Sequence, residues 1–104
     1  MIYELRTYQI AIGALPEFLE MVKKERLPVL AEHGLKPLGF WYTETGTLSE
    51  VVHLWAYADL NERQQKWGKD QRDPRTGALI KRIAPLIVSM STKILSPTEF
   101  SAMK

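Results

Sequence analysis

The predicted strands of this sequence carry large apolar side chains on both faces, and this feature constrains the fold most. Along residues 50–58, one face is aliphatic and the other is mostly aromatic. In order, these residues are Val52, Leu54 and Ala56, then Val51, His53, Trp55 and Tyr57. Antiparallel strands with one solvated face normally alternate between apolar and polar residues. A patch this apolar exceeds what monomers usually expose, so we expect helices on one face and a second copy of the chain on the other.

Hydrophobic periodicity predicts a single domain, residues 1–104, with elements in the order βαββαβ. The first helix carries apolar residues at helical spacing, and Gly46 marks a hairpin turn between the two central segments. This order predicts an α+β, ferredoxin-like fold with a four-stranded antiparallel sheet. The predicted ranges are strand 2–10, helix 15–33, strands 38–44 and 50–58, helical pieces from 60 and from 74 to Pro85, and strand 86–95.

Helix ends are marked by recognisable residues. Gly34 is placed to end the first helix, Asp59 and Glu62 have the spacing of a capping box, and Asp73-Pro74 is typical of a helix start. Pro28 interrupts the first helix, so we expect a kink near Arg26–Leu27. The helix after Asp59 is mostly polar, and we expect Leu60 and Trp67 to anchor it.

Composition excludes several classes of site. The chain has no cysteine, which rules out disulfides and thiolate-bound metals. His33 and His53 are the only histidines and lack ligand spacing, and no phosphate loop or dinucleotide fingerprint is present. We therefore expect no metal and no cofactor. Without a signal peptide or an apolar run of membrane-spanning length, the expected location is cytoplasmic.

Motifs along nearly the whole chain resemble the NIPSNAP family. The resemblance is carried by Ile2-Tyr3-Glu4-Leu5-Arg6-Thr7-Tyr8, Leu15-Pro16-Glu17-Phe18-Leu19, Gly39-Phe40-Trp41, Val51-Val52-His53-Leu54-Trp55-Ala56-Tyr57, Asp73-Pro74 and Ile94-Leu95-Ser96-Pro97-Thr98-Glu99-Phe100-Ser101. It implies a compact, bacterial-type member that forms a dimeric α+β barrel. That architecture is related to cofactor-free antibiotic-biosynthesis monooxygenases, and the family offers no settled activity.

Ionisable and aromatic residues share faces of two strands that are neighbours in a ferredoxin-like sheet. They are Glu4, Arg6 and Tyr8 on one strand, and His53, Trp55 and Tyr57 on the other. One interpretation is a pocket in which a buried histidine acts as acid or base and the aromatics hold an apolar ligand. The other is a dimer interface in which Glu4 and Arg6 form an ion pair.

Two further residues are candidates near the first helix. Arg26 falls on the apolar stripe and could bind an anion, although a kink at Pro28 favours a solvent-directed side chain. His33 lies at the helix C-terminus, where the helix dipole favours a capping role over metal binding.

A basic ridge, residues 63–82, contains seven basic and two acidic side chains. Its only aromatic residue is Trp67, too few for stacking on nucleic acid, so we expect a solvated helix face. Two hypotheses for the whole protein remain. The first is a homodimer that encloses a small, largely apolar ligand, with cofactor-free oxygenase-like or isomerase-like chemistry. The alternative is a non-catalytic dimeric interaction module.

Overall fold

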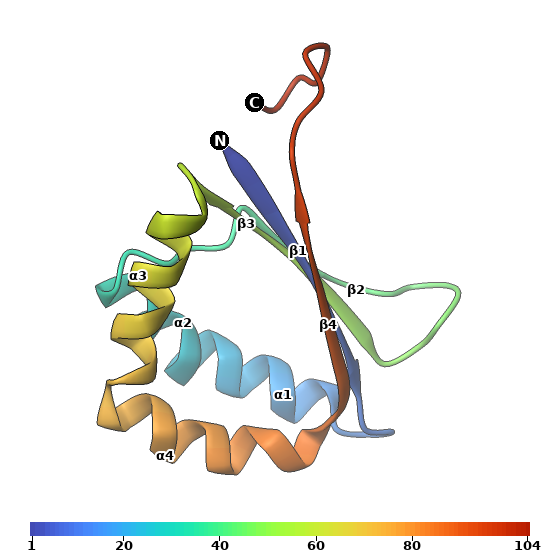
Figure 1. Ribbon diagram of the computed structural model, residues 1–104. Helices are drawn as coiled ribbons and strands as arrows, with labels where there is room; N and C mark the ends of the chain where they lie inside the picture. The colour runs from blue at the N-terminus through green and yellow to red at the C-terminus, as the bar shows by residue number, and fades with distance from the viewer.

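All helices of the protein lie on one side of a four-stranded antiparallel sheet (Figure 1). The computed structural model describes residues 1–104, and the strand order in the sheet is β2-β3-β1-β4. This arrangement confirms the predicted ferredoxin-like α+β fold. The elements are β1 (Ile2–Ile10), α1 (Leu15–Met21), η1 (Val22–Arg26), α2 (Leu27–Glu32), β2 (Gly39–Tyr42), β3 (Glu50–Tyr57), α3 (Leu60–Gln71), α4 (Pro74–Ile83), η2 (Ala84–Leu86) and β4 (Ile87–Leu95).

The first helical segment continues past Pro28 by means of a π turn. In η1 the backbone hydrogen bonds span five residues instead of the four of an α-helix. The amide of Leu27, for example, donates to the carbonyl oxygen of Val22. Pro28 then occupies the first turn of α2, where its missing N–H costs least. The irregularity predicted near Arg26–Leu27 is therefore a widened turn, a common device for absorbing a local mismatch in a helix.

The predicted helix signals are confirmed with one exception. The Glu62 amide donates to Asp59 Oδ1 at 2.8 Å, and the Arg75 amide donates to Asp73 Oδ1 at 2.9 Å. Gly34 has a φ of +76°, as a helix-ending glycine should. Leu60, however, is 59% exposed and does not anchor α3, because it lies at the first turn outside the core. α3 has 12 residues, and no helix combines the length and hydrophobicity needed to cross a membrane.

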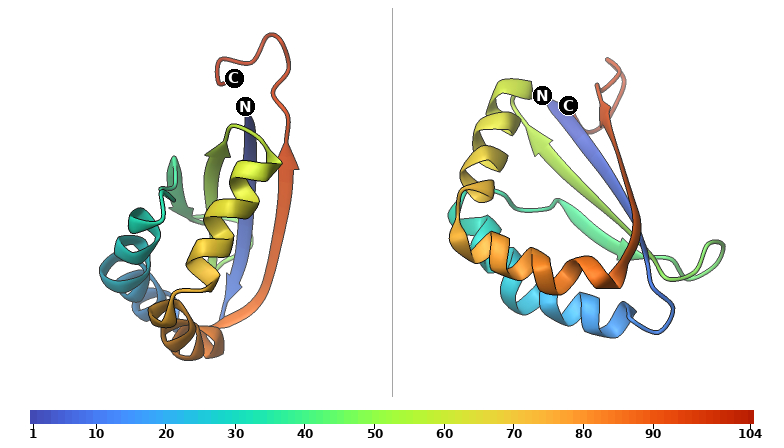
Figure 2. Two further views of the ribbon diagram at one scale, coloured as in Figure 1. Left: turned by 60° about the vertical axis from the view of Figure 1, so that its left-hand side comes forward. Right: turned by 60° about the horizontal axis from the view of Figure 1, so that its bottom comes forward.

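The six ionisable and aromatic residues expected to cluster do share one face of the sheet. β1 pairs with β3 so that Glu4 lies opposite Trp55 and Arg6 opposite His53. This face is covered by the helices of the same chain, as two further views show (Figure 2). Glu4, His53, Trp55 and Tyr57 are buried there. The interpretation of this cluster as a dimer interface is therefore wrong.

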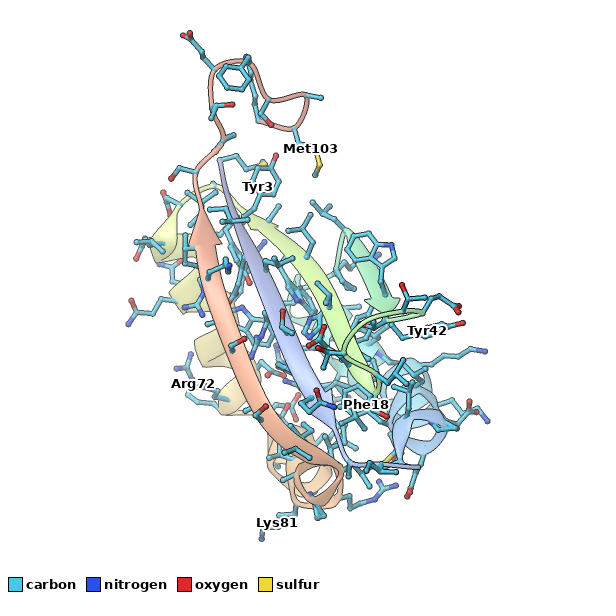
Figure 3. All side chains as sticks on the ribbon, turned by 90° about the vertical axis from the view of Figure 1, so that its right-hand side faces the viewer. Tyr3, Phe18, Tyr42, Arg72, Lys81 and Met103 are labelled. Atoms are coloured by element: carbon cyan, nitrogen blue, oxygen red, sulfur yellow. The ribbon has the colours of Figure 1, made fainter.

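The opposite, open face of the sheet carries the aliphatic set, and Figure 3 looks onto it. Leu5 pairs with Leu54, and Val52 with Trp41, which places these four side chains together. Trp41 is 55% exposed. Its ring lies over Gly39, where an added Cβ would come within 2.2 Å of the indole. Glycine at position 39 therefore allows the indole to lie along this face.

Two buried clusters hold the helices to the sheet. One contains Phe18, Val51, Leu79 and Ile83 among its members, and the other contains Leu30, Leu35, Trp55 and Tyr57. The two clusters do not merge into one continuous core. A cavity lies between them.

Candidate functional site

A cavity of about 280 Å³ lies between the helices and the covered face of the sheet. Eighteen residues line it, and twelve of them are hydrophobic. Residues of both core clusters border it, so the core is open where the two clusters meet. Its apolar wall includes Phe18, Val22, Leu27, Leu30, Phe40, Ile80, Ile83, Ile87 and Met90.

His53 lines this cavity in a single, well-defined tautomer. Its ring stacks on Phe40 with centroids 4.5 Å apart, and Tyr8 meets it edge-on at 4.7 Å. The Trp55 indole N–H donates to His53 Nδ1 at 2.7 Å. Burial, together with the nearby Arg6 charge, lowers the pKa of His53 to about 3. His53 is therefore neutral at pH 7, and because Nδ1 accepts, its proton lies on Nε2.

Arg6 is placed beside His53 without a carboxylate partner. Its guanidinium carbon lies 4.8 Å from the centre of the Trp67 ring and 5.5 Å from that of Tyr8. No ion pair within the protein engages the guanidinium, and its polar neighbour is the Tyr8 hydroxyl. Arg6 Nε and His53 Nε2 are the only buried side-chain nitrogen or oxygen atoms left without a hydrogen-bond partner. Most buried polar groups in proteins are satisfied, so two such donors at one cavity need an explanation.

Glu4 has the opposite environment, because each of its oxygens is engaged. Tyr57 Oη donates to it at 2.7 Å, Arg63 donates from two nitrogens at 3.0 and 2.9 Å, and Thr92 Oγ1 donates at 2.6 Å. Burial acts to raise the pKa of Glu4, but these hydrogen bonds outweigh it and hold the pKa at about 2. The predicted ion pair between Glu4 and Arg6 is wrong, since the carboxylate faces Arg63 instead.

Arg26 points into the protein and is fully paired. Its guanidinium donates to both carboxylate oxygens of Asp70, at 2.9 and 2.7 Å, and Thr76 Oγ1 donates to Asp70 Oδ1 at 2.8 Å. The prediction of a solvent-directed Arg26 is wrong, because the π turn keeps this position on the inner side of the helix. The Arg26–Asp70 ion pair lines one side of the cavity, and its two charges compensate each other.

The remaining charged candidates are structural. His33 Nε2 lies 2.9 Å from Asp73 Oδ2, which ties the end of α2 to the start of α4. Along the basic ridge, Lys66 pairs with Glu62, and Arg82 with Glu25, at the surface. No group of three or more histidine or acidic side chains is arranged to hold a metal ion.

The cavity brings together five of the seven candidate residues. Arg6, Tyr8, Arg26, His53 and Trp55 line it. Glu4 and Tyr57 lie beside it, in the network with Arg63.

Five residues that complete the site are not among the candidates predicted from the sequence, namely Phe40, Arg63, Trp67, Asp70 and Thr76. A signal for three of them was present. Arg63, Trp67 and Asp70 are spaced i, i+4, i+7, so they share one face of α3. A helix with so few apolar residues has to direct some polar side chains inward.

The fold and the cavity define a ferredoxin-like α+β domain with a pocket between its helices and its sheet. A family model described as NIPSNAP matches residues 3–102. The chain therefore belongs to the NIPSNAP family, as its motifs indicated.

Relatives and solved structures agree with this assignment. Protein NipSnap of Drosophila melanogaster is 29% identical over 96% of this chain, and NipSnap homolog 2 of Danio rerio is 30% identical over 99%. The chain spans only 36% and 35% of the length of these two relatives. A NIPSNAP family protein from Agrobacterium tumefaciens is 38% identical, with a TM-score of 0.94 over 99% of this chain and 98% of the other.

The same fold also occurs outside the family. A candidate antibiotic biosynthesis monooxygenase from Nitrosomonas europaea superposes with a TM-score of 0.69 over 93% of this chain and 98% of its own. Its sequence is only 10% identical, so the similarity concerns the fold alone.

Proposed function

We propose that this protein is a homodimer that binds a small, largely apolar ligand in the cavity between its helices and its sheet. The observation that carries the proposal is the cavity itself, about 280 Å³ with a mostly hydrophobic lining. Ligand sites typically measure roughly 300–1,000 Å³ and combine apolar walls with a few placed polar groups. A well-packed core would have supported the interaction-module alternative instead.

The polar groups around the cavity argue against base-driven, isomerase-like chemistry. A general base needs a free, basic lone pair within reach of the substrate. His53 presents a protonated Nε2, and the low pKa of Glu4 makes its carboxylate a weak base. Asp70 is held by Arg26 and Thr76.

Ligand binding is tested with a neutral apolar probe, 2-naphthamide, added to the purified protein. Binding should quench the fluorescence of Trp55 and Trp67, which line the cavity. Replacing Val22 with Trp should fill the space and abolish binding, whereas the exposed Leu48→Trp control should bind as the parent does. Equal binding by both variants would show that the probe lies elsewhere.

The dimer is supported by the open face of the sheet. An apolar surface there is formed by Leu5, Val52, Leu54 and Trp41, and no helix of the chain covers it. A two-fold dimer would place this surface against the same surface of a second copy and bury it.

Assembly is tested by analytical ultracentrifugation at micromolar concentration. Leu54→Glu should shift the dimer towards monomer, because a carboxylate would be buried in the interface without a partner. Leu60→Glu is the matched control, since Leu60 is exposed on the helical side. A parent protein that sediments as a 12.0 kDa monomer would refute the dimer.

A further inference from the structure

The unpartnered groups of the cavity share one chemical character, since both are hydrogen-bond donors. His53 Nε2 carries the proton of a neutral imidazole, because Nδ1 accepts from Trp55. Arg6 Nε is a donor on a permanently charged guanidinium. The cavity therefore presents one positive charge and two donor atoms, while the nearby carboxylates of Asp70 and Glu4 are engaged by Arg26 and Arg63.

The two donors are held close together. Arg6 and His53 are directly opposite each other in the β1–β3 register and point to the same face. Tyr8 contacts both, with the Arg6 guanidinium over its ring and the His53 ring against its edge. His53 is held between Phe40 and Trp55, and the Arg6 guanidinium lies over the Trp67 ring.

Arg26, the other arginine that lines the cavity, has the carboxylate partner that Arg6 lacks. Arg26 meets Asp70 through two parallel hydrogen bonds, so its charge is compensated within the chain. The acid nearest to Arg6 along its own strand, Glu4, is occupied by Arg63. An arginine left unpaired at a mostly apolar cavity is suited to a planar anion from outside, which it can bind through more than one N–H group.

We propose that the ligand of this cavity is a small apolar monocarboxylic acid whose carboxylate is bound by Arg6 and His53 Nε2–H. This inference rests on the proposed ligand-binding function and specifies its substrate class. The two carboxylate oxygens match the two donors, and the hydrophobic wall accepts the body of the acid. A cation is excluded by the Arg6 charge, and a neutral ligand leaves that charge uncompensated.

The test compares three probes with one apolar body, which are 2-naphthoate, 2-naphthamide and 2-naphthylmethylammonium. In calorimetric titration at pH 7 the carboxylate should bind roughly 10- to 100-fold more tightly than the amide, the range for a charge-assisted hydrogen bond. The ammonium probe should bind more weakly than the amide. Raising the salt concentration should narrow the gap between carboxylate and amide affinity only slightly, because the donating Arg6 Nε is buried.

Two variants separate the charge from the pocket. Arg6→Met should remove the preference for the carboxylate while the amide still binds, and Arg72→Met, an exposed arginine outside the cavity, should keep the preference. His53→Phe should weaken binding of the carboxylate probe more than binding of the amide probe. Circular dichroism and thermal unfolding of each variant establish that it is folded.

The outcomes distinguish the two levels of the proposal. If the amide and the carboxylate bind the parent equally, the acid-binding inference is overturned and the apolar pocket stands. If the preference survives in Arg6→Met, the carboxylate is bound elsewhere and the inference is again overturned. If no probe binds at all, the proposed ligand-binding function itself fails.

Discussion

Two polar regions lie side by side on the covered face of the sheet, and they are built in opposite ways. Around Glu4, three side chains donate to one carboxylate and its charge is met by Arg63. Around Arg6 and His53, two buried donors have no partner in the protein. Burying polar groups unsatisfied is costly. The first region therefore contributes to stability, whereas the second reduces it as long as its two donors have no partner.

The largest effect should come from breaking the satisfied region. Glu4→Gln retains the shape of the side chain but removes its charge, which leaves Arg63 unpaired and sets an amide N–H₂ against donors. Loss of one partner from a buried ion pair costs roughly 3–5 kcal/mol. Because the Arg63 side chain is 32% exposed, we expect a loss of about 2–4 kcal/mol in urea unfolding. A loss below about 1 kcal/mol would mean that the network is not stabilising.

The pH dependence of stability should separate the two regions. The pKa of His53 is about 3 in the folded protein, below its ordinary value of 6.5. The unfolded chain therefore binds more protons below pH 6.5, and folding stability falls as the pH drops from there towards 3. The Glu4 contribution is complete above pH 4.5 and is lost only as the pH falls towards 2.

Between pH 6.5 and 4.5 the His53 effect should therefore reduce stability by about 2–3 kcal/mol. His53→Phe should flatten this part of the profile, as measured by urea unfolding at several pH values. His33→Gln, which removes the other histidine, should retain the decline. A His53→Phe profile as steep as that of the parent would contradict a neutral, buried imidazole.

Removing the charge of the unsatisfied region should have a smaller effect, and of opposite sign. Arg6→Met replaces a half-buried, unpaired guanidinium with an apolar side chain of similar length. Lost stacking on Trp67 opposes the gain from removing the charge, so we expect a net stabilisation of about 1 kcal/mol. The change in stability is measured by thermal unfolding. A destabilisation above about 1 kcal/mol would show that Arg6 is a structural residue.

The smallest effect concerns the tautomer of His53. Trp55→Phe removes the N–H that donates to Nδ1 while keeping most of the aromatic volume, and it should cost about 1 kcal/mol. The more informative measurement is the ¹⁵N shift of the imidazole. It should show the proton on Nε2 in the parent and a mixture of tautomers in the variant. A parent protonated on Nδ1 would refute the assignment.

Much of this site could be predicted from local sequence patterns. Alternation along two strands was enough to place Glu4, Arg6 and Tyr8 beside His53, Trp55 and Tyr57, because the ferredoxin-like order makes those strands neighbours. The capping box at Asp59 and the helix start at Asp73 are set by neighbouring residues, so they too were accessible. These features depend on periodicities of two and 3.6 residues, which the chain displays directly.

Other parts depend on contacts between distant residues and could not be predicted. Both faces of β3 are apolar, so the sequence does not indicate which one the helices cover. The partner of Glu4 is 59 residues away, on a helix whose low hydrophobicity suggested a solvated face. Arg26 was assigned to solvent because a proline kink was expected, whereas the π turn left it facing Asp70.

The π turn in η1 also affects how this helix can tolerate insertions and deletions. Each residue of an α-helix turns the chain by about 100°, so losing one residue ordinarily rotates everything beyond it to another face. A π turn contains about one residue more than an α turn. Deleting Lys23 or Lys24, both exposed, would convert η1 to α-helix and leave Arg26, Leu27 and Leu30 facing the cavity. The first helix thus carries one residue that it can lose without changing which side chains line the site.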